Sequence, residues 1–107
     1  MELNFKLEVF EGPLDLLLSL IEKNKIDIYD IEIHILTDQY LAYIEEANRQ
    51  NMELTASFIE MASRLMYIKS CSLLPKEEDE EDPKATLEEM LQQYAKYKQV
   101  SEFLKTK

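Results

Sequence analysis

Apolar residues recur at steps of three and four along most of the chain, which is the spacing of helices that each bury one face. The first such segment follows Gly12 and Pro13 and runs to about Lys23, with Asp15 in the first turn. Its apolar residues lie nearly all round the axis, so we expect this helix at the centre of the fold. They are Leu14, Leu16, Leu17, Leu18, Leu20 and Ile21.

A second helix is predicted over about residues 32–49, with Asp30 placed to cap its N-terminus. Its buried stripe is expected to contain Ile33, Leu36, Tyr40, Ile44 and Ala47.

A third, long helix is predicted from Thr55 to Leu74, capped by Thr55 or by a capping box of Ser57 with Glu60, and ended by Pro75. Its apolar residues cover about half of the circumference, whereas a helix on one small core needs an arc only a little over 100° wide. The excess can pack inside the chain's own bundle or receive a helix of another protein. The residues of this arc are Phe58, Ile59, Met61, Ala62, Leu65, Met66, Ile68 and Leu73, with Lys69 inside it.

Lys69 has a stem that can lie on apolar surface, while its ammonium group needs water or an acidic partner.

Residues 76–82 read KEEDEED, and such a run of acids indicates a solvated linker rather than packed structure. Asp82 followed by Pro83 is typical of a helix start. The last helix is predicted over about residues 84–104, with Leu87, Met90, Leu91, Tyr94 and Tyr97 as its stripe.

At the other end of the chain, residues 3–9 alternate apolar with polar, which predicts an extended arm or edge strand. We therefore expect an all-α fold, a small bundle with an extended N-terminal arm.

The composition of the chain restricts the classes of function that the protein can have. The 107 residues suffice for one domain, and 22 acids against 12 bases give a net charge of −10, which argues against direct DNA binding. A single cysteine fits a reducing compartment, and no apolar run approaches the ~18 residues of a membrane span. These features predict a cytoplasmic protein.

Chemistry-bearing residues are sparse. His34 has no second ligand at zinc spacing, and Cys71 has no nucleophile motif around it. One glycine excludes a glycine-rich phosphate loop, and the acidic run lacks the central glycine of a calcium loop. We expect no enzyme activity, no metal and no cofactor.

Three stretches resemble a known family: FEGPLDLLLSLIEKNKIDIYDI (residues 10–31), LTDQYLAYI (36–44) and ASRLMYIKSCSLLPK (62–76). They are similar to the N-terminal part of bacterial segregation and condensation protein A, the kleisin subunit of the SMC–ScpAB complex. The resemblance covers about residues 5–104. It implies a non-enzymatic subunit that docks on an SMC coiled-coil neck, binds a ScpB dimer, and contacts DNA only indirectly, at the nucleoid. The winged-helix region of the family is absent, so we expect a fragment.

Carried over by position, the resemblance predicts a neck-binding domain at 1–75, a linker at 76–83 and the start of the ScpB-binding segment at 84–107. The neck interface is expected at Phe58, Ile59, Met61, Leu65, Met66, Ile68, Lys69 and Leu73. The ScpB side is expected at Leu87, Leu91, Tyr94 and Tyr97. The alternative is a self-associating helical scaffold, in which the surplus apolar face pairs with a second copy.

Overall fold

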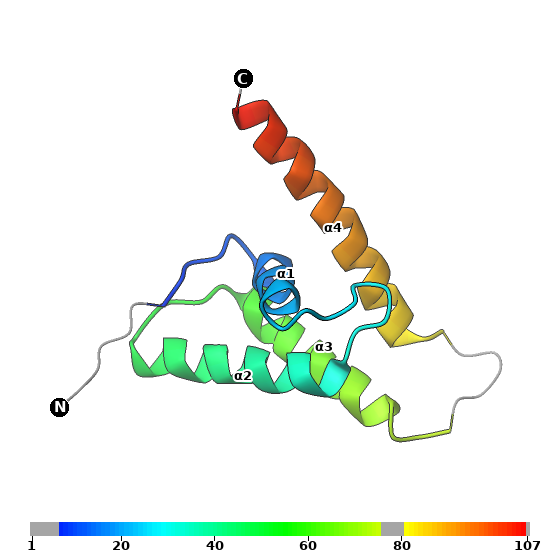
Figure 1. Ribbon diagram of the computed structural model, residues 1–107. Helices are drawn as coiled ribbons and strands as arrows, with labels where there is room; N and C mark the ends of the chain where they lie inside the picture. Colours follow the sequence, from blue (N-terminus) through cyan, green and yellow to red (C-terminus); the bar gives the residue numbers. More distant parts are fainter. Residues whose placement is uncertain (1–6, 76–80, 107) are drawn as a thin grey trace.

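The protein is built from four helices. The computed structural model describes residues 7–75 and 81–106, and no strand occurs within these two ranges. The helices are α1 (Pro13–Lys23), α2 (Ile33–Arg49), α3 (Ala56–Cys71) and α4 (Pro83–Lys105) (Figure 1). The predicted all-α class is therefore confirmed.

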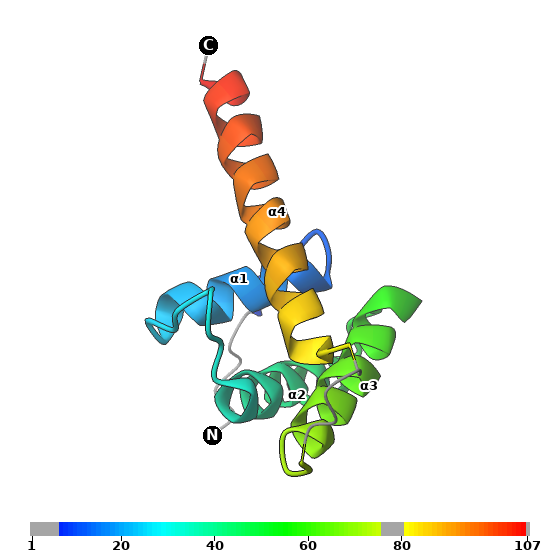
Figure 2. The same cartoon turned by 90° about the vertical axis from the view of Figure 1, so that its right-hand side faces the viewer.

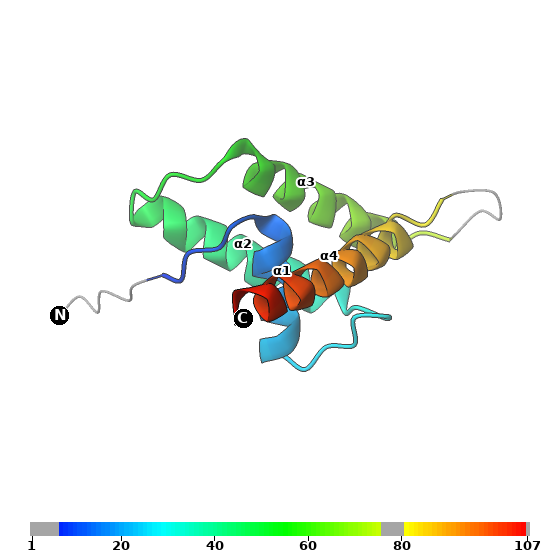
Figure 3. The same ribbon diagram turned by 90° about the horizontal axis from the view of Figure 1, so that it is seen from above.

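Helix α1 is the central element, as its all-round apolar pattern predicts. It starts at Pro13 as expected, and it contacts each of the other three helices. Leu16 and Leu17 are almost completely buried between them. Seen from above, α4 crosses over α1 while α2 and α3 lie on the other side of it (Figure 3). A helix enclosed from several directions needs apolar residues on several faces, which explains its composition.

Helices α2 and α3 form an antiparallel hairpin (Figure 1). The turn after α2 places Asn51 in the left-handed region, at φ 56°, and lets the N–H of Met52 donate to the carbonyl of Ala47 at 2.9 Å. Asparagine tolerates this conformation, so the chain leaves the helix without strain. The predicted stripe of α2 faces the core, with Leu36 and Tyr40 fully buried.

The cap prediction for α2 was wrong, and that for α3 is confirmed in one of its two alternatives. Glu32, not Asp30, is the N-cap residue of α2, and its side chain makes no capping bond. Asp30 instead pairs with Lys84 at the start of α4, at 2.8 Å. At α3 the N-cap residue is Thr55, one of the two predicted alternatives, although its side chain makes no capping bond. The capping box of Ser57 with Glu60 is not the cap, and the hydroxyls of Thr55 and Ser57 bond to each other at 2.7 Å. Helix α3 also ends at Cys71, three residues before the predicted end.

Helix α4 joins the core with its first half only. Asp82 accepts a 3.1 Å hydrogen bond from the N–H of Lys84, and Pro83 occupies the first turn, as predicted. Leu87 and Leu91 are completely buried in the same core as α1, α2 and α3. The second half of α4 projects away from the body (Figure 2). The division between 1–75 and 84–107 stays a prediction, but the core itself extends across that boundary.

The N-terminal arm lies against α2. The Tyr43 hydroxyl donates a 2.6 Å hydrogen bond to the carbonyl of Glu8, and the rings of Phe10 and Tyr43 meet edge to face with centroids 5.6 Å apart. Residues 7–10 form no strand. The remainder of the predicted arm, residues 3–6, and most of the acidic linker, residues 76–80, lie outside the described residues.

Candidate helix-docking surface on α2 and α3

One part of the apolar arc of α3 is buried in the protein's own core. Four of the residues expected at a partner interface, together with Ala62, lie in the core: Phe58, Met61, Leu65 and Ile68. Each of the five is at most 7% exposed. In this arrangement they hold α3 on the bundle and present no surface to a partner.

The other half of the arc is bare. Ile59, Met66 and Leu73 are 52%, 48% and 74% exposed. They stand seven residues apart, so they lie nearly in line along or just beyond α3, and we call them the outer row. Ser63 and Ser70, each four residues after a member of the row, are exposed beside it. Small residues at these positions leave room for the backbone of a neighbouring helix to approach.

A groove opens at the N-terminal end of the outer row. It has a volume of about 490 Å³ and lies between α2 and the start of α3. We call it the α2–α3 groove; its lining is Leu41, Ile44, Glu45, Asn48, Met52, Leu54 and Ile59. Ile59 belongs to both the groove and the outer row, so the two form one continuous surface. Sequence reasoning missed the contribution of α2. Leu41, which lies off the predicted stripe of α2, was the available signal.

Lys69 supplies an ion pair beside the outer row. Its ammonium lies 3.0 Å from Oδ1 of Asp38 on α2. The predicted need for an acidic partner is thereby met, although both groups are partly exposed, and such pairs contribute at most about 1 kcal/mol.

The residues expected on the ScpB side divide in the same way as those of α3. Leu87 and Leu91 are buried in the core, Tyr94 is half-buried and bonded to Glu11, and Tyr97 is exposed. Beyond them α4 shows further exposed apolar side chains that the predicted site did not include. We call the exposed set the outer α4 patch: Tyr97, Val100, Phe103 and Leu104.

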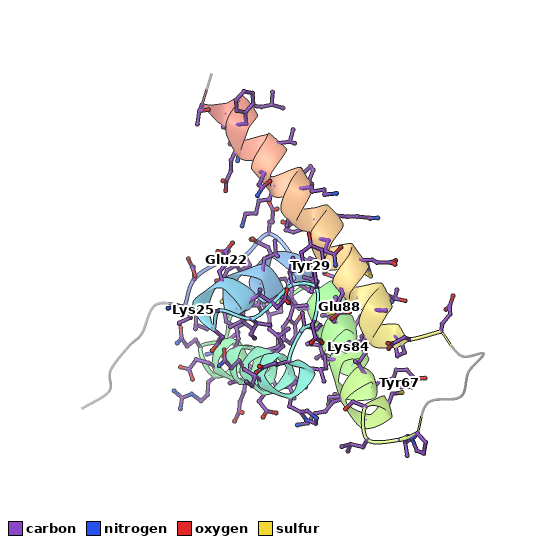
Figure 4. The ribbon with its side chains drawn as sticks, turned by 45° about the vertical axis from the view of Figure 1, so that its right-hand side comes forward. Glu22, Lys25, Tyr29, Tyr67, Lys84 and Glu88 are labelled. Carbon is purple, nitrogen blue, oxygen red and sulfur yellow. The ribbon has the colours of Figure 1, made fainter. Side chains whose placement is uncertain are left out.

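Polar contacts fix the buried half of α4. Near its start, Lys84 pairs with Asp30, and Glu88 accepts a 2.8 Å hydrogen bond from the N–H of Ile31. Figure 4 shows Lys84 and Glu88 on the side of α4 that lies over the connection between α1 and α2. The hydrogen bond to Asp30 raises the pKa of Lys84 above its ordinary value.

Farther along α4, Lys98 forms an ion pair with the buried carboxylate of Asp15, which also accepts a hydrogen bond from the N–H of Glu11. The hydrogen bond to Asp15 raises the pKa of Lys98. Burial raises the pKa of Tyr94, and its hydrogen bond to Glu11 acts in the same direction. These contacts lie where α4 leaves the body, so they set the direction of its projecting half.

The side chains most capable of catalysis or metal binding do not lie together. His34 is exposed on α2, and Cys71 is a half-buried free thiol at the end of α3. Within the described part of the chain, no three His, Cys, Asp or Glu side chains are grouped as metal ligands. No helix there has the length and apolar character needed to cross a membrane. The feature that stands out among the described residues is therefore the exposed apolar surface formed by the outer row and the α2–α3 groove.

Comparisons with known proteins agree on one family. A family model described as "Segregation and condensation protein ScpA" matches residues 20–107. A segregation and condensation protein A of Clostridium acetobutylicum is 46% identical over 100% of this chain and 45% of its own length. Proteins of the same name from Clostridium tetani and Enterococcus faecalis are each 46% identical, over 98% and 99% of this chain. The chain spans less than half the length of these relatives, and it aligns with their N-terminal part.

Proposed function

The chain belongs to the segregation and condensation protein A family, and on that premise we propose that it is the neck-binding module of a kleisin. The module binds the coiled-coil neck of an SMC protein along α3. The observation that carries the proposal is the outer row, Ile59, Met66 and Leu73, which leaves three large apolar side chains bare at heptad spacing. Heptad spacing is what a helix needs to pack along another helix of a coiled coil.

The outer row is large enough to matter energetically. Covering one large aliphatic side chain is worth about 1.5–3 kcal/mol before ordering costs. The α2–α3 groove adds Leu41, Ile44, Met52 and Leu54, none of which is fully buried in the free chain. Preformed grooves of this kind are a common way to bind an amphipathic helix.

The outer α4 patch is proposed as the start of a second interface, with ScpB. Tyr97, Val100, Phe103 and Leu104 lie on the projecting half of α4, away from the outer row. Two separate exposed apolar surfaces support a role in joining two partners, and we propose that these partners are SMC and ScpB.

The remaining features support a non-enzymatic role at the chromosome in the cytoplasm. A net charge of −10 disfavours direct contact with the DNA polyanion. We propose that DNA is held by the assembled complex rather than by this chain, and that the chain contributes to chromosome condensation and segregation through its partners.

The test compares matched substitutions in binding to a purified SMC head–neck fragment, with calorimetry for affinity and circular dichroism for folding. Met66→Glu should abolish binding and leave the helical signal intact, because Met66 is exposed. Phe103→Glu, on the outer α4 patch, should leave neck binding unchanged. Leu65→Glu serves as the core control and should lose helicity.

If Met66→Glu binds the neck as well as the original chain does, the proposal is wrong. Light scattering of the isolated chain tests the alternative, self-association. A dimer that Met66→Glu dissociates and that an SMC neck does not displace would assign the outer row to a second copy.

A further inference from the structure

We infer that the helix bound by α3 carries basic residues along the edge that lies over α2, and that one of its apolar side chains enters the α2–α3 groove. This inference rests on the proposed function and specifies the chemistry of the partner. It follows from the position of the outer row, from the charges beside it and from the groove at its end.

The outer row runs along α2. At its start, Ile59 shares the groove with Leu41 and Ile44 of α2. Farther along, Lys69 lies three residues after Met66 and four before Leu73, and it reaches Asp38 of α2. A helix packed on the outer row therefore has one edge over α2 and the other over solvent.

The edge over α2 is acidic. Asp38 and Glu45 stand seven residues apart on α2, so they lie on the same side of that helix. Asp38 pairs with Lys69, whereas Glu45 lines the groove and forms no ion pair with another described residue. Covering a carboxylate with an apolar surface removes its hydration without replacing it, which is unfavourable. A lysine or arginine on the partner turns this cost into an attraction.

The geometry also restricts the contact. Ile59 and Met66 stand seven residues apart on α3, which corresponds to about 10.5 Å along the helix, and Leu73 follows just after α3 ends at Cys71. The matching helix must therefore present apolar residues at seven-residue spacing along this row, with its basic edge near the end that enters the groove. A coiled-coil helix with basic residues flanking its apolar seam has this pattern.

The experiment measures affinity for the SMC head–neck fragment in three variants of the chain and at several salt concentrations. Glu45→Gln should weaken binding about two- to fivefold, since partly exposed interfacial ion pairs are worth up to about 1 kcal/mol. Glu45→Lys should weaken it further, because it places like charges together. In both variants the affinity should depend less on salt than in the original chain.

Glu102→Lys is the matched control. It makes the same change of charge at an exposed position of α4 outside the groove and the outer row, and it should change affinity less than twofold. Because lysine and glutamine have helix propensities close to that of glutamate, circular dichroism should show all three variants folded.

The outcomes separate the two claims. If the original chain does not bind an SMC neck, the proposed function fails. If it binds and Met66→Glu blocks binding, but Glu45→Lys behaves like Glu102→Lys, the function stands and the basic edge is wrong. Tighter binding of Glu45→Lys would mean an acidic partner edge and would also overturn the inference.

Discussion

The hydroxyl of Tyr40 on α2 donates a 2.7 Å hydrogen bond to the backbone carbonyl of Phe58 on α3. Tyr40 is completely buried, and this burial raises the pKa of its phenol well above the ordinary value of 10.0. The bond ties the first turn of α3 to the middle of α2, next to the groove. It therefore helps to hold Ile59, the residue that follows Phe58, in its place at the end of the outer row.

Tyr40→Phe should lower the free energy of unfolding by about 1–2 kcal/mol, because a buried hydrogen bond is lost and a carbonyl loses a partner. Urea denaturation at neutral pH measures this. Tyr29→Phe, at an exposed tyrosine, should have no effect. An equal loss in both variants would show that the Tyr40 bond contributes nothing.

Tyr40 also makes stability depend on alkaline pH. Its raised pKa means that the folded protein keeps the phenol protonated while the unfolded chain ionises near pH 10.0. This contribution is complete below pH 10.0 and is lost as the pH rises toward the folded pKa. Above pH 10, the urea concentration at the midpoint of denaturation should decrease with rising pH in the original chain. It should decrease less steeply in Tyr40→Phe. Parallel curves would contradict this prediction.

Thr37→Val should stabilise the protein by up to about 1 kcal/mol. The Thr37 hydroxyl is buried on α2 and has no hydrogen-bond partner among the described residues, so its desolvation is not offset. Valine keeps the shape without the hydroxyl. Thr37→Ala, which leaves a small cavity, should destabilise instead. Thermal unfolding of the pair distinguishes the two effects, and a loss with valine would show that the hydroxyl has a partner.

Leu91→Ala should cost about 2–5 kcal/mol, the usual range for a buried leucine, whereas Leu104→Ala should change stability by less than about 0.5 kcal/mol. Both leucines lie on α4, but Leu91 is in the core and Leu104 is on the projecting half. Urea denaturation of the two variants tests whether α4 belongs to the folded unit. For the same reason, a fragment of residues 1–75 should unfold more easily than the whole chain, and equal stability would contradict the shared core.

Phe103→Glu should weaken binding to ScpB at least tenfold, since an exposed aromatic anchor is replaced by a charge. Its helicity and its neck binding should not change, because Phe103 is exposed on the projecting half of α4. Surface plasmon resonance against purified ScpB measures the effect. Unchanged ScpB affinity would remove the outer α4 patch from the proposed interface.

Local sequence signals were enough for the elements themselves. Pro13 and Pro83 marked the first turns of α1 and α4, and both starts are confirmed. The cap of α2 was misassigned because Asp30 has a competing partner, Lys84, that is 54 residues away in sequence. Capping rules describe neighbours along the chain, and they do not include a cation brought in by another helix.

The apolar arc of α3 shows a second limit of prediction from the sequence. Helical periodicity predicted that Phe58, Ile59 and Leu65 are apolar positions of one helix, but it could not say which neighbours cover them. The structure buries Phe58 and Leu65 and leaves Ile59 half exposed. The division is set by α1 and α2, whose positions depend on the whole bundle. For the same reason the pattern could not place Leu87 in the core.

Helix α4 is continuous from Pro83 to Lys105, although only its first half is enclosed. Pulling on its projecting end would transmit tension along the helix to Leu87 and Leu91, and across the Lys98–Asp15 ion pair to α1. A force on the projecting half of α4 would therefore act on the same core that holds α1, α2 and α3 together.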